Sequence, residues 1–168
     1  MTQKQYKEEH IPHRINLLIT YRERFANLSD AERQKIRDFD RCAKDIAMLM
    51  IRFFLNELGI GLTRGHLDIS PRQNFVFTKN LTVAEVKSDK LYPSILEVLK
   101  AANRAVAHIE PNEVDHNFKT ALDDKRIFEV ISYVENKIKS HIYGSNLEFE
   151  IAMNLPNNDM HRSKLKLF

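Results

Sequence analysis

The chain is poor in cysteine, glycine and proline. It has one cysteine, Cys42, in 168 residues, so it can form neither an internal disulfide nor a cysteine-rich zinc site. Only four glycines and five prolines argue against collagen-like chains, linker-rich chains and sandwiches with many turns. The longest apolar run, near residues 46–55, is interrupted by Arg52 and is too short to span a bilayer, which takes about 20 residues.

The first ten residues, MTQKQYKEEH, contain no apolar segment of the kind found in secretory signals. We therefore expect a cytoplasmic protein. Hydrophobic residues make up 43% of the chain and charged residues 29%, as in ordinary globular proteins. The net charge of +3 permits contact with nucleic acid without implying it. We predict a single helical domain over residues 1–154 and a polar tail over 155–168.

Apolar residues at helical spacing predict four long helices. The first covers residues 11–25, and the last covers about 125–143. The second begins at a capping box, Ser29 with Glu32, and is expected to run unbroken to Leu58. The third begins at a second expected capping box, Ser94 with Glu97. The buried stripe predicted for the second helix is Ile36, Phe39, Ala43, Ile46, Met50, Phe54 and Leu58.

Two short segments alternate in the manner of β-strands. Between residues 61 and 80, Leu67 and Ile69 predict one strand and Phe75 and Phe77 a second, with the turn at residues 71–74. A loop anchored by the two phenylalanines is the alternative. An edge strand is predicted over residues 147–151. The expected fold class is mainly α: an antiparallel bundle of four or more helices with a small β-hairpin or edge-strand appendage.

The sequence has no glycine-rich phosphate-binding loop, dinucleotide-binding fingerprint, nucleophile elbow or H-E-x-x-H zinc helix, so we expect no cofactor and no metal. His10 and His13 could share a helix face as metal ligands. Their position on either side of Pro12, at the start of a helix, argues against a metal site there. Cys42 is interpreted as a small buried or half-buried side chain that fills space beside the core.

A row of four cations lies along one side of the second predicted helix. Arg33, Arg37, Arg41 and Lys44 recur at helical spacing, as expected of a surface that binds a phosphate backbone. The alternative is a solvated face on which these cations pair with neighbouring aspartates. On the same helix we expect Arg52 to be paired on the side that it shares with Asp45.

The third helix carries Arg104 and His108 four residues apart, with Lys100 one turn earlier and Asn103 adjacent. An imidazole can transfer a proton near neutral pH, and a guanidinium can hold a phosphate. Together they could cleave RNA without a metal, by activating a 2′-hydroxyl. This spacing of Arg and His also arises by chance in a chain with this many of both, so it is no evidence alone.

Three segments resemble the HEPN superfamily of helical proteins, and in particular the HEPN-like proteins carried as integron gene cassettes. They are PHRINLL (residues 12–18), RCAKDIAMLM (41–50) and ANRAVAH (102–108). The resemblance implies an all-α fold that often dimerises. In catalytic members it implies an RNA-cleaving site, in which Arg104 would orient the phosphate and His108 would act as acid and base. Catalytic members place four to six residues between these two, whereas this chain has three.

We therefore expect a mobile-element module that binds RNA or a protein partner, without firm catalytic activity. The alternatives are a toxin-like ribonuclease that uses Arg104 and His108, and a protein–protein adaptor or antitoxin. We also expect a homodimer through a helix face, which would bring two copies of the Arg104 and His108 face together.

Overall fold

The computed structural model describes residues 6, 10–69, 80–107, 122–143, 147–148 and 166–167, with side chains described only as far as Asn103 in the third of these ranges. Most of this part of the chain is helical, which confirms the predicted fold class. The helices are α2 (Ile11–Phe25), α3 (Asp30–Lys35), α4 (Arg37–Glu57), α5 (Val83–Ser88), α6 (Tyr92–Ala107) and α7 (Asp124–Ile138), with a π-helical turn η2 (Lys139–Tyr143).

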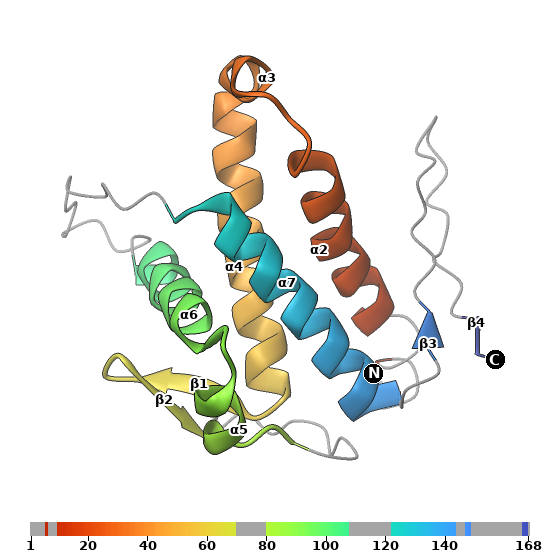
Figure 1. Ribbon diagram of the computed structural model, residues 1–168, viewed down its shortest axis with the longest axis vertical. Coiled ribbons are helices and arrows are strands. Elements are labelled where there is room, and N and C mark those ends of the chain that lie inside the picture. The colour runs from red at the N-terminus through yellow and green to blue at the C-terminus, as the bar shows by residue number, and fades with distance from the viewer. Residues whose placement is uncertain are drawn as a thin grey trace.

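The longest helix, α4, is the centre of the bundle. It packs against α2, α6 and α7, and Figure 1 shows α2 and α6 on either side of it with α7 crossing in front. The core side of α4 supplies Ala47, Met48, Ile51, Phe54 and Leu55, all buried. The predicted apolar faces of the first and last long helices are also buried, at residues such as Ile15 and Ile131.

Polar contacts fix the neighbouring helices to one another. Arg22 of α2 donates to the Ser132 hydroxyl of α7 at 2.8 Å and to the Glu135 carboxylate at 3.0 Å. Arg126 of α7 pairs with Glu97 of α6 at the surface. The first of these links is half-buried and holds α2 against α7.

The predicted unbroken helix over residues 29–58 is wrong in one place. The Ser29 capping box is present, because the Ser29 and Glu32 side chains each accept a hydrogen bond from the other residue's backbone N–H. The helix then breaks at Ile36, where φ is −115° and ψ is 22°. Arg33 donates to the Phe25 carbonyl and Ile36 packs against the core, so α3 is tied to the end of α2.

The predicted stripe on this helix is also partly wrong. Phe54 and Leu58 are buried, but Phe39 and Ile46 are 67% and 55% exposed. Helices α6 and α7 both pack on α4, and the face of α4 that is buried is the one that carries Ala47, Met48 and Ile51. The predicted stripe is therefore rotated from the true core by about a quarter of a turn.

The hairpin lies earlier in the chain than predicted. Strand β1 (Ile60–Thr63) pairs antiparallel with β2 (His66–Ile69). The strand that contains Leu67 and Ile69 therefore pairs with the residues before it, whereas the sequence predicted pairing with the residues after it. Arg64 and Gly65 both have positive φ, 50° and 82°, as a two-residue hairpin turn requires. Phe75 and Phe77 lie outside the described residues.

Three further elements differ from expectation. Helix α6 begins at Tyr92, so the expected capping box at Ser94 is wrong. A capping box joins Thr82 to Glu85 instead, at the start of the unpredicted α5. Near the C-terminus, β3 (Leu147–Glu148) pairs with β4 (Lys166–Leu167), which lies within the predicted polar tail.

The hairpin turn gives a test of this fold. A Cβ at Gly65 would have room, because its nearest described neighbour is Lys100 Cε at 4.0 Å. The cost of substitution therefore comes from the positive φ alone. Gly65→Val should lower the free energy of unfolding in urea by about 1–2 kcal/mol, and Gly65→Asn by clearly less, because asparagine tolerates this conformation. Equal losses for the two variants would contradict the turn.

Candidate functional site: the outer stripe of α4

Large apolar side chains lie on the side of α4 that faces away from the core. Phe39, Ile46 and Leu49 are 67%, 55% and 36% exposed, and Cys42 is exposed. Phe53, one turn beyond Leu49, is half-buried and packs against the edge of the core. Their spacings of three, four, three and four residues place them on one helical face. We call Phe39, Cys42, Ile46, Leu49 and Phe53 the outer stripe.

Helix α2 supports both ends of the outer stripe. The Phe39 ring stacks on Phe25 with 6.2 Å between ring centroids, and the Arg14 guanidinium lies 4.4 Å from the centroid of the Phe53 ring. Leu17, which is 45% exposed, follows Arg14 by three residues and so lies on the same side of α2. The stripe is therefore positioned by packing, although its middle is open to solvent.

This surface corrects two sequence predictions at once. Phe39 and Ile46 were expected in the core, and Cys42 was expected to be buried or half-buried. The signal was present in the sequence, because apolar residues cover more than half of the circumference of α4 while a helix on the surface of a bundle buries one face. The pattern alone does not tell which part of that wide apolar surface is covered.

The predicted basic row divides into two kinds of residue. Arg33 pairs with Asp124 and lies 3.4 Å from Asp40 Oδ1. Lys44 pairs with the same Asp124, at 2.7 Å, and donates to the Leu122 carbonyl at 2.6 Å. These two half-buried cations tie α3 and α4 to the start of α7, and their charge is already matched.

Arg37 and Arg41 are different, because both are exposed on the outside of α4. Among the described residues, neither guanidinium has a hydrogen-bond or ion-pair partner. Of the four cations in the row, these two are the ones placed to meet a phosphate. Two exposed arginines one turn apart form a much smaller basic surface than the sequence predicts.

The predicted site on α6 is only partly within the described residues. Lys100 and Asn103 are half-buried on α6, three residues apart. Arg104 belongs to the same helix, but its side chain is outside the described part, as is the whole of His108. The geometry of an Arg104 and His108 pair therefore stays a prediction.

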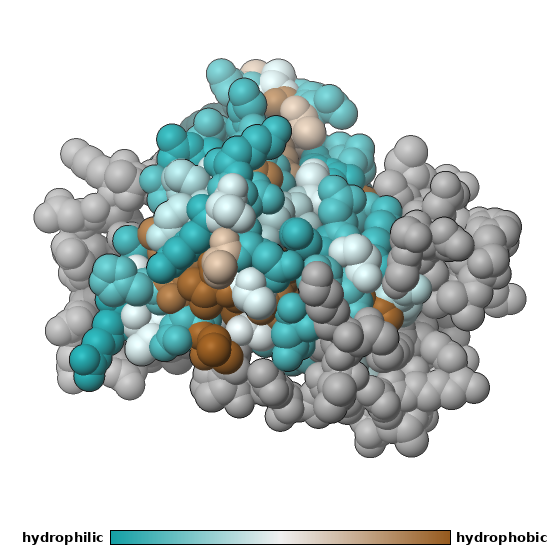
Figure 2. All heavy atoms as spheres, turned by 60° about the horizontal axis from the view of Figure 1, so that its bottom comes forward, coloured by the Kyte–Doolittle hydropathy of each residue, from teal (hydrophilic) through white to brown (hydrophobic). Residues whose placement is uncertain are grey.

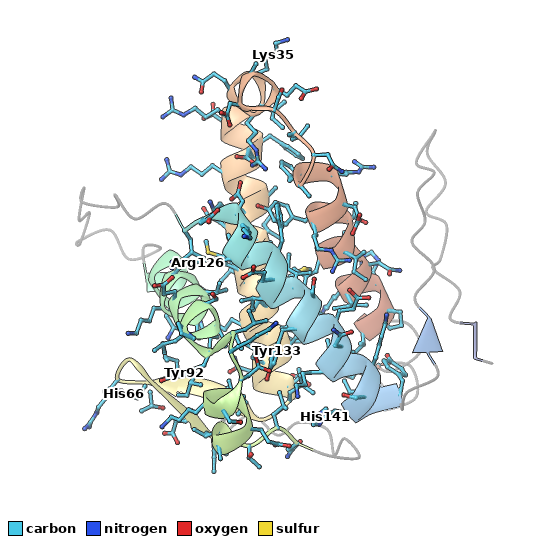
Figure 3. The ribbon with its side chains drawn as sticks, viewed as in Figure 1. Lys35, His66, Tyr92, Arg126, Tyr133 and His141 are labelled. Atoms are coloured by element: carbon cyan, nitrogen blue, oxygen red, sulfur yellow. The ribbon has the colours of Figure 1, made fainter. Side chains whose placement is uncertain are left out.

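A shallow cleft of about 610 Å³ lies between α7 and the segment that precedes α6. It is formed by residues 89–91 together with Glu129, Ser132, Tyr133, Asn136 and Lys137. Figure 3 shows Tyr133 on the side of α7 that faces α5 and α6. Charges of both signs surround the cleft, so it shows no preference for an anion or a cation.

Tyr133 is the chemically unusual residue of this cleft. It is 6% exposed, and its hydroxyl has no hydrogen-bond partner among the described residues. Burial raises the pKa of Tyr133 to about 12, and the nearby Asp89 and Glu85 carboxylates add to the effect. The Lys137 ammonium lies 5.4 Å from the centroid of its ring.

Two other properties bear on function. Among the described residues, no group of three or more His, Cys, Asp or Glu side chains is placed to hold a metal ion. No helix in that part of the chain has the length and apolar character needed to cross a membrane.

Comparison with known proteins finds no matching family model, no matching curated protein and no matching solved structure.

The divided basic row predicts unequal effects of substitution. Arg33→Ala should lower the free energy of unfolding by about 1–3 kcal/mol, because it removes charged hydrogen bonds and leaves Asp124 with less compensation. Arg37→Ala should change it by less than about 0.5 kcal/mol, since Arg37 is exposed. Urea unfolding at neutral pH measures both, and similar losses would show that the row is not divided as described.

Tyr133 predicts a dependence on alkaline pH. Its pKa is higher in the folded chain than the usual value near 10 in the unfolded chain, so the folded state retains the proton longer. This contribution to stability is fully present below about pH 10 and is lost as the pH rises through about 12. Between these values the wild type should lose more stability than Tyr133→Phe, as measured by urea unfolding, and parallel losses would contradict the assignment.

Proposed function

We propose that this chain is a HEPN-like binding module of the mobile-element type that acts in the cytoplasm by contact with another protein, without catalytic activity of its own. The observation that carries the proposal is the outer stripe of α4. Monomeric proteins seldom leave several large apolar side chains exposed together unless the surface binds something. Apolar and aromatic residues, rather than charged ones, are typical of the centre of a protein interface.

RNA is the second candidate ligand, and one observation favours it. Arg37 and Arg41 are exposed on α4, and the chain has a net charge of +3. The support is smaller than the sequence predicted, because Arg33 and Lys44 already pair with Asp124. A protein that binds RNA through many phosphates needs a larger basic surface than two arginines.

The adaptor or antitoxin alternative fits the same surface, since both act through protein contacts. The ribonuclease alternative rests on Arg104 and His108 and draws no support from the outer stripe. Three residues between the two, fewer than in catalytic HEPN-like proteins, also favour binding over cleavage.

The proposal can be tested by photo-cross-linking in living cells. The photoreactive amino acid benzoylphenylalanine replaces either Phe39, which is 67% exposed on the outer stripe, or Ile69, which is 66% exposed on β2. We expect a covalent adduct with a protein from position 39 and none from position 69. The matched exposure separates a specific contact from simple accessibility.

Two results would contradict protein binding at this face: no adduct from position 39, or equal adducts from both positions. An adduct from position 39 that nuclease treatment removes would instead favour RNA. The mass of the adduct shows whether the bound protein is a second copy of this chain or a different protein.

A further inference from the structure

We infer that the outer stripe of α4 packs against the outer stripe of a second copy, with the two α4 helices antiparallel and a two-fold axis close to residues 47 and 48. This inference rests on the proposed protein-binding function and names the partner. It places the dimer contact on α4, whereas the sequence suggested the face of α6 that carries Arg104 and His108.

The spacing of the stripe is the first observation. Phe39, Ile46 and Phe53 recur every seven residues, and Cys42 and Leu49 lie midway between them. This is the repeat by which two helices pack along their length with interlocking side chains. A repeat of this kind, on a helix whose opposite face is already buried in the core, fits a partner helix better than a flat or irregular surface.

Charge supplies the direction of the partner helix. Asp45 and Arg52 lie seven residues apart, on the same flank of the outer stripe. Both are half-buried, and neither forms an ion pair with another residue of the described chain. The sequence predicted a partner for Arg52 on its own helix, and that prediction is wrong for this chain taken alone.

Antiparallel pairing joins these two residues across the dimer. When Ile46 of one copy lies opposite Leu49 of the other, Cys42 lies opposite Phe53 and Asp45 lies opposite Arg52, because each pair is centred near the same point of α4. The two-fold axis repeats every contact, giving two Asp45–Arg52 pairs. Apolar contacts and charge thus agree on one register.

Parallel pairing leaves Asp45 without an opposite charge. In parallel helices Asp45 would lie near Met50 of the second copy and Asp38 near Ala43, so neither aspartate would meet an opposite charge. Arg52 would lie near Glu57 at the end of α4, but the Glu57 side chain already interacts with Tyr6 of its own chain. In the antiparallel register the other flank brings the small Ala43 opposite the long Met50. The antiparallel arrangement is therefore the one that the residues beside the stripe favour.

The first arm of the test measures the mass of the full chain in solution by sedimentation or light scattering. We expect a dimer for the wild type. Ile46→Glu should give a monomer that is still folded, because Ile46 is exposed in the single chain and the charge is unfavourable only at the contact. Ile69→Glu is the matched control, on the hairpin at another part of the molecule, and should remain a dimer.

The second arm tests the register by exchanging charges. Asp45→Arg and Arg52→Asp should each weaken the dimer by at least about tenfold, because each places like charges opposite one another twice. The double variant with both changes restores opposite charges and should recover most of the affinity. Additive weakening in the double variant would overturn the register.

The third arm tests direction with the natural cysteine. In the antiparallel register two Cys42 residues lie about 16 Å apart along the helices, too far for a disulfide, so mild oxidation should leave the wild type unlinked. Phe53→Cys places a thiol opposite Cys42 and should give a covalent dimer. Adding Cys42→Ser to that variant should abolish the link. Efficient cross-linking of the wild type would indicate parallel helices and overturn the inference.

A wild-type monomer at high protein concentration would also overturn this inference. It would leave the proposed function standing if position 39 still cross-links to a different protein in cells. Failure of both experiments would overturn both proposals, so the two can be judged separately.

Discussion

The whole structure depends on how α4 divides its apolar surface. One face, which includes Met48, Ile51 and Leu55, is buried by α6 and α7, and this burial holds the bundle together. The opposite face leaves Phe39, Ile46 and Leu49 in water, at a cost that folding of one chain does not recover. A helix with two apolar faces can bury both only when something outside the chain covers the second.

Figure 2 shows a different side of the molecule, at the end with α5 and the hairpin, where a small hydrophobic area lies within a mainly hydrophilic surface.

Much of the fold could be predicted because most of the long helices have clear local signals in the sequence. The apolar face of α2 and that of α7 are single stripes, and the Ser29 capping box has both of its hydrogen bonds. The break at Ile36 could not be predicted in this way, because it depends on contacts that Arg33 makes with Phe25 and Asp124. The hairpin was misplaced because its turn uses a positive φ at Arg64, which is not a usual turn residue.

The candidate site was harder to predict than the fold. Helical spacing shows that Phe39 and Ile46 share a face, but not whether the chain itself covers that face. Likewise, the row from Arg33 to Lys44 is visible in the sequence, whereas the pairing of two of its members with Asp124 depends on residues 80 or more positions away. Charged residues that stabilise the fold and charged residues that are free to bind a ligand have the same sequence pattern. They can be distinguished only by the partners that they have in the three-dimensional structure.

The most direct test of this account is a distance between two copies. Lys35 is the last residue of α3 and lies at the tip of the molecule, beside the start of α4 (Figure 3). A spin label at Lys35→Cys, in a chain with Cys42→Ser, reports the separation of the two tips by pulsed electron resonance. Antiparallel α4 helices predict a separation on the order of 40 Å, because the tips lie at opposite ends of the dimer. A separation below about 20 Å, as parallel helices would give, or the absence of any dipolar interaction, would contradict the account.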